Sequence, residues 1–181
     1  MARTVPLPGF GAAAVGFDTP FEMLEACHER VQRSLDLLRR IVVHIDSKGH
    51  DEQSRSALGD VLRYFDIAGP LHHQDEELHV FPALLAHPDG LVLAAVEQLR
   101  ADHLRMHGQW GELRQVLLGW QGDADAGAVS EPERRLLGDF VDIYERHIPL
   151  EEAVAYPAAR QEFGAADLAR IGVEMAARRR G

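Results

Sequence analysis

Apolar residues recur three and four positions apart along most of this chain, the spacing of helices that bury one face. The alternation of apolar and polar residues that marks strands is hard to find. The pattern predicts four long helices, followed after Gly164 by a shorter amphipathic stretch at 165–179 that docks on the outside. The long helices are expected to begin near Thr19, Asp51, Leu91 and Ser130.

Short motifs mark the ends of these helices. "TPFE" at Thr19–Glu22 offers an N-cap threonine, a proline at the first helical position and a capping-box glutamate, and "SEPE" at Ser130–Glu133 repeats that chemistry. Gly49 can supply the left-handed residue that stops the first helix, and "HPDG" at His87–Gly90 is a turn after the second. Pro70 falls inside the second helix, where we expect a kink.

Four long helices with short connections favour an antiparallel up-down four-helix bundle, because that arrangement buries one stripe from each helix. The predicted fold class is therefore all-α, with an extra short C-terminal helix. We expect a flexible N-terminal arm at 1–17, the bundle at 18–162, and the C-terminal helix and basic tail at 163–181.

Length and charge narrow the classes of function. A chain of 181 residues suits one domain, and a net charge of -10 argues against nucleic acid and anionic membranes as partners. No apolar run approaches the roughly 20 residues that span a bilayer. A single cysteine, Cys27, excludes an internal disulfide and favours a cytoplasmic location. The tail "MAARRR" is predicted to be ordinary solvated charge.

Histidine occupies a core position on each of the four apolar stripes. A single histidine on an apolar face is usually a hydrogen-bonded core residue. Four such helices, with carboxylates one turn away, point instead to a metal, because buried carboxylates survive by neutralising, pairing or binding a cation. These four histidines are His28, His72, His103 and His147.

Three pairs of polar residues have the spacing of ligands on one helix face. His72 and Glu76, His103 and His107, and His147 and Glu151 each lie four positions apart. Four residues turn a helix through about 400°, so both members of a pair project from the same side, roughly 6 Å apart along the axis. Imidazole and carboxylate together suit iron, zinc or manganese better than calcium or magnesium.

An internal repeat favours His72 over its neighbour His73 as the ligand. "HHQDEELHVFP" at His72–Pro82 and "HIPLEEAVAYP" at His147–Pro157 align without gaps, and both read His, three residues, Glu-Glu, three residues, aromatic, Pro. His73 then lies about 100° round the helix and is expected outside the ligand set. The alternative register, which pairs His73 with Glu77, stays open.

One histidine on the first helix, "HxxxE" on the second, "HxxxH" on the third and "HxxxE" on the fourth resemble the hemerythrin family. The stretch "HHQDEELHVFP" is similar to that of the bacterial hemerythrin-like HHE cation-binding proteins, and the likeness covers roughly 21–161. The resemblance implies a non-haem di-iron centre with two bridging carboxylates. The implied ligands are His103, His107 and His147 on one iron, His28 and His72 on the other, and Glu76 and Glu151 as bridges.

The resemblance also implies a function. The iron with fewer histidines keeps an open position for a small ligand, so we expect binding or sensing of dioxygen, with nitric oxide or peroxide as other partners. Oxygen-carrying members place an aspartate five residues after the fourth-helix histidine, whereas this chain has Glu151 at plus four and Glu152 at plus five. Zinc or manganese could replace iron.

Several alternatives remain open from the sequence. An enzyme acting on peroxide or nitric oxide would use the same centre, as would a structural or storage module, so enzymatic activity is undecided. A ferritin-like site is the rival architecture, because Glu25–His28 and Glu76–His79 fit its Glu-x-x-His spacing. That alternative leaves His107 and the His147–Glu151 pair without a role.

Overall fold

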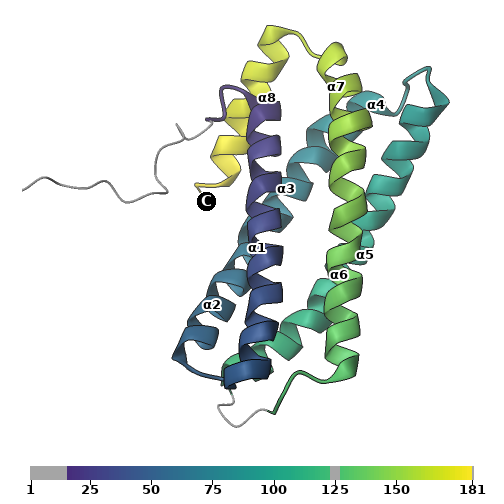
Figure 1. Cartoon of the computed structure of the whole chain (residues 1–181). Helices are drawn as coiled ribbons and strands as arrows, with labels where there is room; N and C mark the ends of the chain where they lie inside the picture. The colour runs from purple at the N-terminus through teal and green to yellow at the C-terminus, as the bar shows by residue number, and fades with distance from the viewer. Residues whose placement is uncertain (1–15, 123–126, 181) are drawn as a thin grey trace, which may run out of the picture.

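A computed structural model describes residues 16–122 and 127–180, and within these ranges the chain is helical with no strand. The helices form four rods, each a single helix or a run of consecutive helices. The second rod runs from α2 (Glu52–Arg63) through α3 (Gly69–Asp75) to α4 (Phe81–Leu84), and the fourth is α6 (Glu131–Leu150) continued by α7 (Tyr156–Glu162). The first and third are α1 (Pro20–Lys48) and α5 (Gly90–Gly122), and successive rods run in opposite directions (Figure 1). The predicted all-α bundle is confirmed, together with the extra C-terminal helix α8 (Ala165–Arg178).

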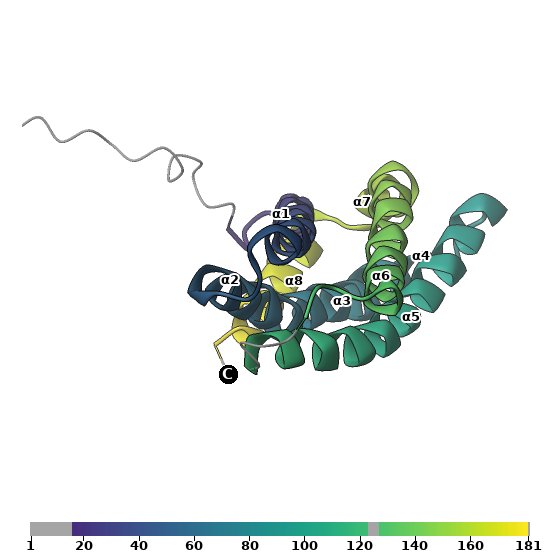
Figure 2. The same cartoon turned by 60° about the horizontal axis from the view of Figure 1, so that its bottom comes forward.

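Viewed closer to its long axis, the bundle shows α1 beside α2 and α5 beside α6, with α8 packed outside near α1 (Figure 2). Most of the expected arm at 1–17 lies outside the described residues. No helix in the part of the chain that the structure describes is long and apolar enough to cross a membrane.

The helix boundaries follow the sequence signals with one exception. The backbone N–H of Ser54 donates to Asp51 Oδ1 at 2.8 Å, and the backbone N–H of Ser130 donates to Glu133 Oε2 at 2.7 Å. Gly49 follows α1 with a φ of 80°, as its position predicted. Thr19 precedes α1 but makes no side-chain capping bond, so Pro20 at the first position is the signal that operates there.

Three π-turns widen the second and fourth rods. They are η1 (Tyr64–Ala68), η2 (Glu76–Val80) and η3 (Glu151–Ala155), and each ends one residue before an X-Pro bond. Proline lacks an N–H, and in an α-helix its ring clashes with the carbonyl four residues earlier. A π-turn displaces that carbonyl, because the preceding residue bonds five residues back. The prolines are Pro70, Pro82 and Pro157, so the kink expected at Pro70 takes the form of a π-turn.

Two apolar clusters fill the bundle, one toward each end. Leu38, Leu58 and Phe140 belong to the cluster at the α1–α2 turn, and Phe81 and Met175 belong to the cluster beneath α8. Between them each rod carries buried polar side chains. The bundle therefore has a polar layer between two apolar clusters. This layer consists of His28, His72, Glu76, His103, His147 and Glu151.

The C-terminal helix is tied to the second rod by a buried ion pair. Asp75 is fully buried, and both Arg178 and Arg179 donate to its carboxylate, Arg179 Nη2 at 2.6 Å from Oδ2. The prediction that this tail is solvated charge is wrong for these two arginines. Asp75 immediately precedes η2, so the tail holds the segment that starts the polar layer.

Gly172 lets α8 approach the start of the described chain. A Cβ at this position would overlap the carbonyl oxygen of Phe17, which is backbone and cannot swing away. Gly111, in the middle of α5, has open space where its Cβ would be. The two glycines therefore offer a matched pair.

We predict that Gly172→Ala lowers the free energy of unfolding by about 1–3 kcal/mol, since the added methyl overpacks the α8 contact. Gly111→Ala should raise it by about 0.5–1 kcal/mol, because alanine favours an exposed helix interior. Urea unfolding followed by circular dichroism measures both. Equal stabilisation by the two substitutions would show that α8 does not pack closely against Phe17.

Candidate metal centre

The polar layer brings together six of the seven predicted ligands, each with at most 7% of its surface exposed. Their ligand atoms form two groups, and within each group the atoms lie within 4.8 Å of one another. Both groups contain the same two glutamates, so the carboxylates stand between two pairs of imidazoles. One group is His28, His72, Glu76 and Glu151, and the other is Glu76, His103, His147 and Glu151.

All four imidazoles turn the same nitrogen toward a carboxylate. Glu151 has Oε2 at 3.0 Å from His28 Nε2 and Oε1 at 2.8 Å from His147 Nε2. Glu76 has Oε2 at 3.3 Å from His103 Nε2 and Oε1 at 3.5 Å from His72 Nε2. Each glutamate is thus approached by one histidine of its own rod and one of another rod, which links the fourth rod to the first and the second to the third. His103 Nε2, 3.9 Å from Glu151 Oε1, joins the two pairs.

The second glutamate of each Glu-Glu pair orients a histidine from outside. Glu152 Oε1 lies 2.8 Å from His28 Nδ1, and Glu77 Oε1 lies 3.1 Å from His103 Nδ1. A carboxylate at Nδ1 holds a proton there and directs Nε2 inward, the arrangement that metal-binding histidines use. The internal repeat therefore has a physical meaning, and the second glutamates are functional residues that the sequence argument did not assign.

Tyr156 is a further residue that the sequence argument missed. Its hydroxyl donates to Glu76 Oε1 and lies 3.2 Å from His28 Nε2, and its ring stacks on that of His28 with centroids 5.5 Å apart. Burial raises the pKa of Tyr156 well above its usual value, so the hydroxyl keeps its proton. Phe81 holds the equivalent position in the repeat. Its ring centroid lies 5.4 Å from that of His103, and it has no hydroxyl. The sequence signal that could have identified Tyr156 is the aromatic residue before proline in both copies of the repeat.

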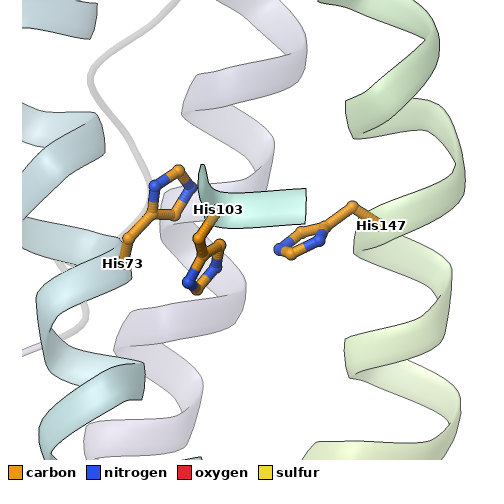
Figure 3. Close-up of side chains that lie close together, drawn as sticks. All are labelled: His73, His103 and His147. Atoms are coloured by element: carbon orange, nitrogen blue, oxygen red, sulfur yellow. The ribbon is translucent and has the colours of Figure 1, made fainter. Parts of the chain in front are cut away.

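The expected pairing of His103 with His107 is not seen in these groups. His107 is exposed and lies outside the groups just described, because Met106, 1% exposed, takes the inward position on α5. His73, which was expected outside the ligand set, lies next to the polar layer. It forms a group with His103 and His147, and its ring stacks on that of His103 with centroids 4.1 Å apart. Figure 3 shows these three rings gathered from α3, α5 and α6.

Burial and pairing act in opposite directions on the charges of the layer. Burial lowers the pKa of His72 to about 3, so that imidazole is neutral. Burial would also lower the pKa of His28, but the nearby carboxylates of Glu151 and Glu152 raise it to about 9. For Glu151, burial would raise the pKa, yet His147 and His28 outweigh it and the net shift is downward. The carboxylates are therefore ionised at neutral pH and need positive charge beside them.

The polar atoms of the layer fit a bound cation. Several buried nitrogens and oxygens have no hydrogen-bond partner within the described residues, an arrangement that costs free energy unless something else coordinates them. Neutral imidazole with carboxylate is a donor set for iron, zinc or manganese. The unpartnered atoms are Nδ1 of His72, Oε2 of Glu76, Nε2 of His103, both ring nitrogens of His147 and both carboxylate oxygens of Glu151.

The ferritin-like alternative does not match this arrangement. Its first glutamate, Glu25, points to Arg160 at 2.8 Å, and its second histidine, His79, contacts Glu174 on α8. Only one member of each Glu-x-x-His pair, His28 and Glu76, reaches the polar layer.

Comparisons with known proteins agree with this layout. The sequence profile of the hemerythrin HHE cation binding domain matches residues 19–159, which hold every residue of the polar layer. An uncharacterized protein of Haemophilus influenzae is 30% identical over 167 residues, which cover 90% of this chain and 91% of that protein. That likeness extends beyond the bundle, whereas α8 lies outside the profile match.

We predict that His73→Ala lowers the metal that the chain retains after iron loading and desalting, because its ring closes the group with His103 and His147. His107→Ala, the matched change on the exposed histidine, should retain the full amount. Elemental analysis by mass spectrometry measures both. Full retention in the first variant with loss in the second would restore the pairing of His103 with His107.

We also predict that Glu152→Ala weakens metal binding about 10–100-fold, since His28 loses the carboxylate that holds its ring and tautomer. Glu162→Ala removes the same charge from an exposed position on α7 and should leave the affinity unchanged. Competition with a coloured chelator gives both affinities. A similar loss in the two variants would mean that only net charge matters.

Proposed function

The chain belongs to the hemerythrin HHE cation-binding family, and we propose that it is a non-haem di-iron protein that binds or senses dioxygen or another small ligand. The observation that carries this proposal is the pair of glutamates shared by two groups of histidines. One cation between two carboxylates would leave one pair of imidazoles unused, whereas two cations use all of them.

The residues divide unequally between the two positions. His28 and His72 would hold one iron, and His103, His147 and His73 would hold the other, with Glu76 and Glu151 between them. The three-to-two division expected from the resemblance is retained, with His73 in the place of His107. Zinc or manganese suits the same donors.

Reduced iron would supply the electrons and the open coordination position that a small molecule needs. The chain supplies the surroundings. Tyr156 holds a proton on its hydroxyl beside Glu76 and His28, on the side with fewer histidines. Leu24 and Phe21, 2% and 5% exposed, belong to the apolar cluster next to this side and exclude water from it. An apolar wall with one hydroxyl donor favours reversible binding of a diatomic molecule, because it excludes the water that could take charge from the bound molecule.

An enzyme that acts on peroxide or nitric oxide is the second candidate. The same Tyr156 hydroxyl favours it, because a buried proton donor next to a carboxylate can serve general acid–base catalysis. A structural or storage role needs no such donor. For all three roles the reducing cytoplasm is the proposed compartment, on the basis of the single cysteine.

We predict about two iron ions per chain in protein from iron-supplied medium, with visible absorption that the metal-free chain lacks. Stopped-flow mixing of the reduced protein with dioxygen should give a spectrum that persists and reverses on removal of oxygen. In Tyr156→Phe the iron content should stay the same, while oxidation becomes faster because the hydroxyl donor is gone.

Two outcomes separate the candidates, and a third tests the role of Tyr156. Steady turnover of peroxide would identify the enzyme. One ion per chain, or zinc with no response to oxygen, would identify the structural or storage role. A Tyr156→Phe variant with unchanged oxidation kinetics would remove that hydroxyl from the proposal.

A further inference from the structure

A groove of about 570 Å³ opens beside the candidate metal centre, between the second rod and α5. Its inner end reaches the rings of His73 and His103. The groove is many times larger than a diatomic molecule needs, and its volume lies within the range of about 300–1,000 Å³ that small organic ligands occupy.

The walls of the groove are mostly apolar and contain fixed aromatic rings. Phe65 and Trp110 stand with centroids 5.0 Å apart, and Trp110 Nε1 donates to Asp66 Oδ1 at 3.0 Å, which holds the indole in place. Tyr144 packs on Phe65 at 5.9 Å and completes this wall. Leu104, also in the lining, is 77% exposed, so an apolar surface is available to a ligand. Offset and edge contacts with such rings favour a flat aromatic body.

The polar side of the groove carries the ion pair of Arg100 and Glu77. Arg100 Nε donates to Glu77 Oε2 at 3.1 Å, and Glu77 in turn accepts from His103. This chain of contacts orients the guanidinium, whose side chain is 54% exposed, and its terminal nitrogens have no partner among the described residues. A guanidinium with free, parallel N–H groups matches a carboxylate. Glu77 is already occupied, so a cationic ligand finds no free anion here.

We propose that this groove binds a small aromatic carboxylate, with the ring against Phe65 and Trp110 and the carboxylate at Arg100. The site goes beyond the proposed function, because its walls and its charge belong to the chain and do not need a metal. It also lies next to His73 and His103, so an occupant contacts the side of the centre opposite Tyr156.

Isothermal titration calorimetry on the full chain tests this proposal with three probes: 1-naphthoate, its uncharged amide, and cyclohexanecarboxylate. We expect 1-naphthoate to bind about tenfold or more tightly than either of the others, since each of them lacks one of the two contacts. The titration is made on metal-free and on metal-loaded protein. Binding to both forms supports the groove even if the iron content contradicts the proposed function, and equal binding of all three probes, or none, overturns the groove.

Two variants locate the probe. Ala101→Phe fills the groove from an exposed position on α5 and should abolish measurable binding, whereas Ala94→Phe, the same change at an exposed position of α5 outside the lining, should not. Arg100→Gln should reduce the affinity for 1-naphthoate about tenfold, to that of the amide, and leave the amide unaffected. Arg135→Gln removes an equivalent charge from an exposed pair with Glu131 and is the control.

Circular dichroism and light scattering accompany both variants. Unchanged 1-naphthoate binding in folded Ala101→Phe would place the probe elsewhere and overturn the proposal. A fall in molecular mass in this variant would also overturn it, because the groove would then be an interface between copies of the chain.

Discussion

Two ionised carboxylates buried between imidazoles are the constraint on which the rest of this structure depends. Glu76 and Glu151 are fully buried and repel one another, and the histidines beside them lower the pKa of each carboxyl. Their charge is tolerable only because histidines from all four rods surround them and because the set can hold cations. The two apolar clusters then act as walls on either side of this layer, and the rods are held at the spacing that the layer requires.

The layer has approximate two-fold internal symmetry with one chemical difference. His28 and Glu152 on one side correspond to His103 and Glu77 on the other, with nearly the same contacts. Tyr156 and Phe81 also correspond, and they differ by a single hydroxyl. One side therefore carries a proton donor, while the other borders the apolar groove. Two similar halves can in this way present two different environments to the same centre.

Local features of the chain could be predicted from the sequence, and features set by packing could not. His72 with Glu76, and His147 with Glu151, lie on one helix face because that geometry is fixed within a single turn. The facing of α5 is not local: its rotation against three neighbours decides that Met106 rather than His107 turns inward. Similarly, the partners of Tyr156 and Arg179 lie far away in the chain, so the local sequence does not indicate the contacts of either residue. The bundle itself required only the apolar stripes.

The π-turns make the length of the rods as important as their composition. Glu76 and Glu151 each stand at the start of a turn that contains one residue more than an α-helical turn. Loss of one residue between 77 and 80 would return this turn to ordinary α-helix, so Phe81 would keep nearly the same facing, but the ring of Pro82 would then meet the carbonyl that the π-turn displaces. Substitutions in these turns alter one side chain, whereas a deletion of one codon would remove the extra residue that accommodates proline within the rod.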